Sequence, residues 1–491
     1  MARFFNFQST IAPLQYMPNF VMKNAMVAYI LALLACNMLY AHYALPIQWW
    51  VFGIVEACGF FYLGHQLIKS WIQLGTKAFA KNLFIISFLL RLAWVIISYW
   101  LYQNWTGTPF SIGAADELFY DDVAHYGAKL LRDGKWDLYS GIHAYTSDTA
   151  FSDMGYPIYL SIVYYIFFDS IFIARIIKAA LSAWTAVLIY KLATRNFGEY
   201  TGRMAGIFCM LMPNLIYYCS FQLKEVEMVF LAMLFAERAD YLLRQGKLTF
   251  LPMISLMAIA AYMFMIRTAL AATLVLAFFC ALVLSSERIV SWGRRLLLII
   301  IAVAFALILF FSSTGIGRDV MDMWETRGTG QQANMEWRSR RGGEVSQTFA
   351  KYAGASVFAP LIFTIPFPSM NYIEGQENQM MIHGGNFVKN IMSFFTLGAL
   401  VLLLLSGNWR KHVLPIAILC GYLVVLVFSS FAHSERFHQP ILPLHMMMAA
   451  YGISMLNQKK YFIKWFNIWC IVMFVAALGW NWFKLAGRGL I

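Results

Sequence analysis

Residues 83–102, LFIISFLLRLAWVIISYWLY, are apolar at almost every position, and Arg91 is their one charged residue. As a helix, a run of this length crosses a hydrocarbon layer of about 30 Å. Comparable runs recur along the 491 residues, of which 61% are hydrophobic and only 12% are charged. Water-soluble domains are nearer to about 45–50% apolar and about 25% charged. The sequence therefore predicts an all-α polytopic membrane protein.

Thirteen apolar runs are predicted to cross the membrane. They lie near residues 24–41, 47–66, 83–102, 174–194, 203–220, 226–242, 249–265, 268–286, 294–312, 389–406, 412–430, 440–456 and 463–483. Basic residues such as Lys77 and Arg195 gather in the loops of one side, which the positive-inside rule assigns to the cytoplasm. The loops 103–156 and 313–388 are then outside, as is the C terminus. This odd number of crossings requires that residues 156–172 dip into the membrane or lie along it.

The overall charge and the cysteines exclude several classes of function. The net charge of +13 is explained by the cytoplasmic loops, so no nucleic-acid partner is expected. The seven cysteines fall inside or at the ends of apolar runs, which predicts buried packing rather than disulfides or thiolate metal ligands. Walker A, GxSxG and HExxH sequences are absent, as is GxGxxG after a strand, which argues against nucleotide-driven chemistry.

The spans and loops predict four regions of the chain. Residues 1–82 hold two N-terminal spans that precede the catalytic unit. Residues 83–312 form a transmembrane catalytic module, which includes the acidic outer loop 103–156. Residues 313–388 form a second outer loop, and residues 389–491 form the C-terminal transmembrane helices.

The stretch SIGAADELFYDDVAHYGAKLLRDG, residues 111–134, places four carboxylates within seven positions, shortly after a span. Its apolar side chains recur at helical spacing, which predicts an amphipathic helix on the membrane that stops at Gly134. Two interpretations of the acids stay open. Either Asp116 caps the helix while the other acids face solvent, or Asp116 and Glu117 supply a base at the membrane surface. The acids are Asp116, Glu117, Asp121 and Asp122, and the apolar stripe is Phe119, Val123, Tyr126 and Leu130.

Ionisable residues also occur at the predicted outer ends of other spans. In FQLKEVEM, residues 221–228, Lys224 and Glu225 are either a simple interfacial pair or a phosphate contact beside a second acid. Further cations on this face would suit a lipid-linked phosphate or pyrophosphate, although snorkelling is the ordinary explanation for such arginines. The second outer loop adds the basic stretch WRSRRGG, residues 337–343. The further cations are Arg175, Lys178, Arg267 and Arg436, and Tyr156 and His433 complete the predicted substrate contacts.

Several segments, taken in order, resemble the GT-C superfamily of membrane glycosyltransferases over roughly residues 80–455. The resemblance is to family-39-like enzymes that use a polyprenyl-phosphate-linked sugar, related to the lipid A aminoarabinose and protein O-mannosyl transferases. The segments are ADELFYDDVAHYGAKLLRDG (115–134), GYPIYLSIVYYIF (155–167), IARIIKAALSAWTAVLIYKLATRNFG (173–198), LKE (223–225) and ERFHQPILPLHMMMAAYGI (435–453).

This resemblance implies a GT-C fold and an inverting transfer of sugar to a lipid, glycan or protein acceptor. The reaction would take place at the outer (periplasmic) face of a bacterial cytoplasmic membrane. By the same resemblance, Asp116 is the general base with Glu117 beside it, Glu225 is a second acid of the site, and Arg436 contacts phosphate. A divalent cation, Mg²⁺ or Mn²⁺, held by Asp116 and Glu225 is a further expectation. The spans within residues 1–82 depart from the family pattern.

Two other functions remain open from the sequence. One is a polymerase or ligase of lipid-linked glycans, of the O-antigen or capsule type, which would share the basic outer loop. The other is a lipid or solute transporter, whose acids are expected within the spans. Here the acids cluster in an outer loop, which favours an enzyme over a transporter.

Overall fold

The chain is helical throughout the part that the structure, a computed structural model, describes. This part comprises residues 14–146, 151–244, 250–286, 290–311, 361–428, 434–455 and 460–491. Within these ranges no strand forms, and the extended pairing is limited to an isolated bridge between Ala44 and Asn371. The predicted all-α class is therefore confirmed.

Among the described residues, six helices are long and apolar enough to cross a membrane. The predicted total of thirteen crossings stays a prediction, because several further helices are shorter or more polar. The six are α1 (Asn19–Leu39), α2 (Ile47–Ser70), α3 (Thr76–Thr106), α7 (Ile171–Phe197), α18 (His383–Leu405) and α22 (Lys460–Ala486). Shorter apolar helices are α11 (Phe250–Ile266), α12 (Thr268–Leu284) and α19 (Val413–Phe428).

The remaining elements range from single turns to helices of 20 residues. They are η1 (Ala41–Tyr43), α4 (Ala115–Arg132), α5 (Leu138–Thr146), α6 (Phe151–Phe167), α8 (Glu199–Leu211), α9 (Pro213–Tyr217), η2 (Tyr218–Ser220), α10 (Glu225–Arg244), α13 (Trp292–Phe311), α17 (Glu377–Met381), η4 (Asn408–Lys411), α20 (Glu435–His438), η5 (Gln439–Ile441) and α21 (Leu442–Ser454).

Residues 83–102 lie in α3, and their single cation, Arg91, joins three helices. Arg91 is fully buried and donates to the Ser182 hydroxyl on α7 at 2.7 Å. It also donates to the carbonyls of Met210 and Cys209, at 3.0 and 3.1 Å, in the last turn of α8. Carbonyls of a last helical turn lack partners within the helix, so a cation there both satisfies them and interacts favourably with the helix dipole. An arginine is therefore tolerated within an apolar span.

Two of the predicted spans are interrupted. The run 203–220 is divided into α8, α9 and η2, because Pro213 has no N–H to continue a helix and instead begins α9. The run 440–456 likewise begins with η5 and continues as the thirteen-residue α21, with Pro440 and Pro443 near the starts of these elements. The prediction of one continuous helix in each run was wrong.

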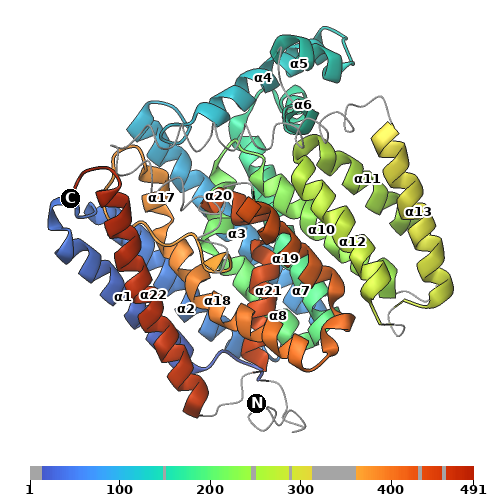
Figure 1. The fold of residues 1–491 in the computed structure, drawn as a ribbon. Helices are drawn as coiled ribbons and strands as arrows, with labels where there is room; N and C mark the ends of the chain where they lie inside the picture. Colours follow the sequence, from blue (N-terminus) through green and yellow to red (C-terminus); the bar gives the residue numbers. More distant parts are fainter. Residues whose placement is uncertain are drawn as a thin grey trace.

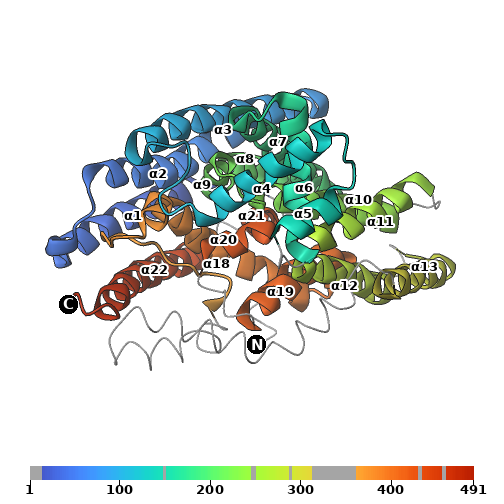
Figure 2. The ribbon, with the colours of Figure 1, turned by 90° about the horizontal axis from the view of Figure 1, so that it is seen from above.

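The helices form a bundle with a cap at one end. In Figure 1, α4 and α5 lie at the top of the bundle, and Figure 2 looks down onto them. Both views place α1, α2 and α22 at one side and α11, α12 and α13 at the other. The acidic stretch of the sequence therefore covers one end of the bundle, at the ends of spanning helices.

Candidate active site

Helix α4 carries four closely spaced acids, Asp116, Glu117, Asp121 and Asp122. It ends at Arg132 and is followed by Gly134 with φ +77°, the left-handed conformation that favours glycine, so the predicted stop is confirmed. The N-cap is Ala114 and no side chain caps the helix, so the interpretation of Asp116 as the cap was wrong. Asp116 instead lies in the first turn, where the helix dipole favours a negative charge, and its side chain is 60% exposed.

The predicted apolar stripe of α4 is only partly buried. Val123 and Leu130 are buried, whereas Phe119 is 44% exposed and Tyr120 is buried in its place. The reason is that α4 packs against α6, where the Tyr120 ring meets the Tyr156 ring edge-on at 5.0 Å. The buried face of α4 is therefore set by its packing against α6.

Arg436 brings together acids from two distant parts of the chain. Its Nη1 lies 2.5 Å from Oδ2 of Asp116, and its Nε donates to Oε1 of Glu225. Burial lowers the pKa of Arg436, but the carboxylates of Glu225 and Asp116 outweigh this effect and raise it, so the guanidinium stays charged. The first turns of α4 and α10 thus meet at α20.

Tyr120 lies among these charged groups. Burial, followed by the negative charges of Asp153, Glu225 and Asp116, raises the pKa of Tyr120, while Arg436 opposes the shift. The hydroxyl therefore stays protonated and able to donate a hydrogen bond. Asp153, on α6, was not among the residues singled out from the sequence.

Lys224 and Arg267 supply further positive charge. The ammonium of Lys224 pairs with Asp153 and donates to the Ile266 carbonyl at 2.9 Å. Burial lowers the pKa of Lys224; the charge of Asp153 opposes this shift and that of Arg267 adds to it. Arg267 lies with its guanidinium 4.7 Å from the centre of the Phe437 ring on α20. Among the described residues, no carboxylate pairs with Arg267.

Glu117 lies behind Asp116, in a buried hydrogen-bond network. Its carboxylate accepts from the Ser111 hydroxyl and from the Gln222 N–H at 2.8 Å, and it lies 3.8 Å from Nη2 of Arg175. Arg175 in turn donates to the Pro109 carbonyl at 2.6 Å. Burial raises the pKa of Glu117, although Arg175 and these hydrogen bonds oppose the shift. This network fixes the start of α4 against α7 and the segment before α10.

Lys178 and Tyr156 form a second buried group. The Lys178 ammonium lies 3.0 Å from Oε2 of Glu227 and 4.7 Å from the centre of the Tyr156 ring. Lys178 and Tyr156 are fully buried, and within the described chain the Tyr156 hydroxyl has no hydrogen-bond partner. Both residues thus lie behind the Asp116–Arg436–Glu225 group rather than on its open side.

Two predicted elements of the site, His433 and the basic stretch 337–343, lie outside the described residues. The residues that sequence reasoning missed are Asp153, Glu227 and Tyr120. Glu227 stands in the same quoted segment as Glu225 and was given no role. Asp153 is 71 positions from its partner Lys224, and no spacing rule links two such residues.

The predicted metal ligands do not fit a divalent cation as they are arranged. Asp116 and Glu225 both bind the guanidinium of Arg436, and a metal ion between them would lie beside that fixed positive charge. A hard cation such as Mg²⁺ also prefers about six oxygen ligands. In the described ranges, no group of three or more acids, histidines or cysteines is arranged to hold a metal.

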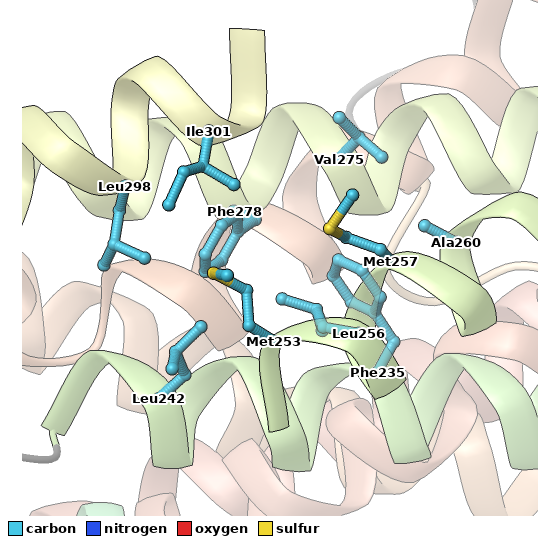
Figure 3. A pocket seen from close by; sticks show the side chains of 10 residues that line it. All are labelled: Phe235, Leu242, Met253, Leu256, Met257, Ala260, Val275, Phe278, Leu298 and Ile301. Atoms are coloured by element: carbon cyan, nitrogen blue, oxygen red, sulfur yellow. The ribbon is translucent and has the colours of Figure 1, made fainter. Parts of the chain in front are cut away.

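An apolar cavity of about 40 Å³ lies elsewhere, between α10, α11, α12 and α13. In Figure 3 the side chains of Met253, Met257 and Phe278 face this space together with other apolar residues. Phe235 and Leu242, which line it from α10, are 10 and 17 positions beyond Glu225. With no ionisable group in its lining, the cavity cannot supply the chemistry of the charged site.

The chain is similar to known glycosyltransferases. Residues 380–488, which include α18 to α22 and hence Arg436, match the Alg9-like mannosyltransferase family. No curated protein matches the chain. A solved structure that it resembles is the archaeal oligosaccharyltransferase AglB from Archaeoglobus fulgidus, in complex with an inhibitory peptide and a dolichol-phosphate. The TM-score is 0.41 at 13% identity, over 84% of this chain and 56% of AglB, so the chain spans about half of that protein. The family match bears out the resemblance to GT-C membrane glycosyltransferases.

Proposed function

We propose that this protein is an inverting glycosyltransferase of the GT-C type. It moves a sugar from a polyprenyl-phosphate donor to a lipid, glycan or protein acceptor, at the outer face of a bacterial cytoplasmic membrane. The observation that carries the proposal is the Asp116–Arg436–Glu225 group, with Arg267, which pairs with no described carboxylate, beside α20. It offers an exposed carboxylate and two guanidinium groups at one end of the bundle, where a lipid-linked phosphate can reach them.

The chemistry requires a base and a stabilised leaving group. Asp116 takes the proton of the acceptor hydroxyl as its oxygen attacks the anomeric carbon of the donor sugar. The new carbon–oxygen bond forms as the bond between that carbon and the phosphate oxygen breaks, and the polyprenyl phosphate leaves with the electron pair. Arg267 and Arg436 stabilise the charge that develops on the phosphate. Glu225 holds Arg436, and its buried Oε2 has no hydrogen-bond partner among the described residues.

In this arrangement the donor activates the base. While Arg436 binds Asp116, the ion pair occupies the carboxylate and keeps it from the acceptor hydroxyl. An incoming phosphate competes for the same guanidinium and releases Asp116 toward the acceptor. Glu225 is buried and keeps its contact with Nε during this exchange. Glu117, Arg175, Lys178 and Tyr156 act as positioning residues behind the site.

The test is transfer from a set of polyprenyl-phosphate sugars in detergent, with Asp116→Asn compared with Asp122→Asn. Asp122 is on the same helix, is exposed and accepts from the Tyr145 hydroxyl at 2.8 Å, so it is a matched control. Asp116→Asn should lower kcat about 10²- to 10⁴-fold, the usual contribution of a general base, and Asp122→Asn should leave it near the native value.

Full activity of Asp116→Asn would show that Asp116 is not the base. If the native chain transfers sugar from no donor, glycan polymerisation and transport are the functions to test next. The assay is repeated with a chelator and with added Mg²⁺ or Mn²⁺. Activity that persists with the chelator is expected, and its loss would restore a metal to the mechanism.

A further inference from the structure

Helix α20 is a single turn whose consecutive residues contact different neighbours. Arg436 contacts α4 and α10, the Phe437 ring lies under Arg267, and His438 contacts α18. Successive helical residues are rotated by about 100°, so side chains two positions apart project in nearly opposite directions. His438 is therefore placed to anchor the back of the turn whose front carries Arg436.

The partner of His438 is a buried lysine. Lys389 on α18 is 3% exposed, its ammonium donates to the Ile365 carbonyl, and its Nζ lies 2.8 Å from Nδ1 of His438. No carboxylate contacts this ammonium within the described chain. An ammonium can only donate, so Nδ1 is the acceptor and the ring proton is on Nε2. A buried cation without a counter-charge is costly, which calls for a reason to keep it.

Anchoring the segment that contains Ile365 does not explain why position 389 holds a lysine. Asn390, the next residue on α18, donates to the Thr364 carbonyl and to the Pro366 carbonyl at 3.0 Å. Ser393 donates to the Phe363 carbonyl at 2.7 Å. Neutral side chains thus already anchor this segment. The contact that Lys389 alone adds is the one to His438.

We propose that Lys389 is a positioning residue for the donor phosphate. Through His438 it fixes the orientation of α20, so that Arg436 meets Asp116 in the free protein and the phosphate of the donor when it arrives. This inference rests on the proposed function and adds to it a link from α18, some 47 positions away in sequence, to the phosphate-binding arginine.

The experiment measures binding of polyprenyl phosphate, without sugar, together with the donor KM and kcat of the full chain. Lys389→Met and His438→Gln should each weaken binding and raise the donor KM about tenfold, the effect of losing one hydrogen bond to a charged group, with a smaller change in kcat. His438→Asn should stay near native, because its amide oxygen occupies the position of Nδ1 and can accept from Lys389. Asn390→Leu, the control, loses two bonds to the segment that contains Ile365 and should bind the lipid as the native chain does.

Several outcomes would overturn the inference. If Asn390→Leu weakens binding as much as Lys389→Met, the lysine only anchors that segment. If His438→Asn and His438→Gln bind polyprenyl phosphate equally well, the contact at Nδ1 has no role in binding. This comparison tests the inference even if Lys389→Met fails to fold. If the native chain transfers sugar and Lys389→Met matches it, this inference alone fails. If the native chain neither binds polyprenyl phosphate nor transfers sugar, the proposed function fails with it.

Discussion

Five acids and five cations lie together at the capped end of the bundle, and their pairing is uneven. Each acid contacts a cation, but Arg436 serves both Asp116 and Glu225, and no described acid pairs with Arg267. The other pairs are Glu117 with Arg175, Asp153 with Lys224, and Glu227 with Lys178. These contacts leave Arg267 as a guanidinium that no described carboxylate neutralises. A phosphodiester carries one negative charge, so a lipid-linked sugar phosphate is the class of anion that this imbalance suits.

Arg267→Gln should separate binding from stability. Because no described carboxylate depends on Arg267, its removal leaves no buried charge unpaired, and the unfolding temperature should stay near native. Binding of polyprenyl phosphate should weaken by about 1.5–3 kcal/mol, the range for hydrogen bonds to charged groups. Titration of the lipid and thermal unfolding in detergent measure the two quantities. Native affinity in the variant would remove Arg267 from the phosphate site.

Glu117 gives the stability of the chain a pH dependence of known sign. Burial raises its pKa above the ordinary 4.5, so the folded chain holds this proton more tightly than the unfolded chain. The contribution of Glu117 to stability is therefore fully present below pH 4.5 and is lost as the pH rises through the folded pKa. Glu117→Gln is neutral at every pH and lacks this loss. The unfolding temperature of the variant relative to native should rise as the pH increases above 4.5; parallel profiles would contradict this expectation.

At the scale of elements, the sequence predicted the existence and the end of α4, but not the ion pairs that surround it. Helical spacing and Gly134 gave its existence and its end, because both are local signals. Arg175 and Lys178 were expected at the outer face, where the positive-inside rule does not favour them. The structure explains their presence, since they are counter-ions of Glu117 and Glu227, which come from other elements. Such pairs depend on tertiary packing and leave no pattern in the chain.

The two N-terminal helices, α1 and α2, both contact the start of α18. Glu56 on α2 accepts from the Gly385 N–H at 3.0 Å, and the Tyr29 hydroxyl on α1 lies 2.9 Å from Nε2 of His383. Glu56 thus supplies an acceptor to a free N–H in the first turn of α18, and Tyr29 holds the side chain of the first residue of that helix. The helices of residues 1–82 thus support the helix that carries Lys389.

The packing of α4 on α6 decides whether Asp116 is held in place. A Cβ added at Gly127 would lie 2.1 Å from Oγ and 2.8 Å from Cβ of Ser161 on α6. Gly127→Ala should therefore destabilise the chain by about 1–3 kcal/mol through overpacking, which outweighs the gain of about 1 kcal/mol in helix propensity. It should also lower kcat, since α4 must shift. Gly59→Ala on α2, where a Cβ meets nothing within 4 Å, is the control and should not destabilise. Equal thermal stability of the two variants would contradict this packing.

Across the whole molecule, α10 joins two groups of charges of different character. Its first residue, Glu225, belongs to the candidate site, and twelve positions later Glu237 pairs with Arg195 at 2.7 Å. This separation corresponds to about 18 Å of helix. Asp240 extends the second group through Arg244 at 2.9 Å. The ion pairs of Glu237 and Asp240 suit a structural role, whereas the end that holds Arg267, which pairs with no described carboxylate, suits ligand binding.

The orientation of the molecule in the membrane follows from the basic loops alone and is open to a direct test. Lys135 lies in the exposed segment after α4, and Asn408 lies exposed in η4 between α18 and α19. If the candidate site faces outward, a membrane-impermeant maleimide should label Lys135→Cys in intact cells and Asn408→Cys only after permeabilisation. The native chain is the blank, because its seven cysteines are buried or partly buried. The reverse pattern would place the Asp116–Arg436–Glu225 group in the cytoplasm, and the lipid-linked donor would then have to be used on that side.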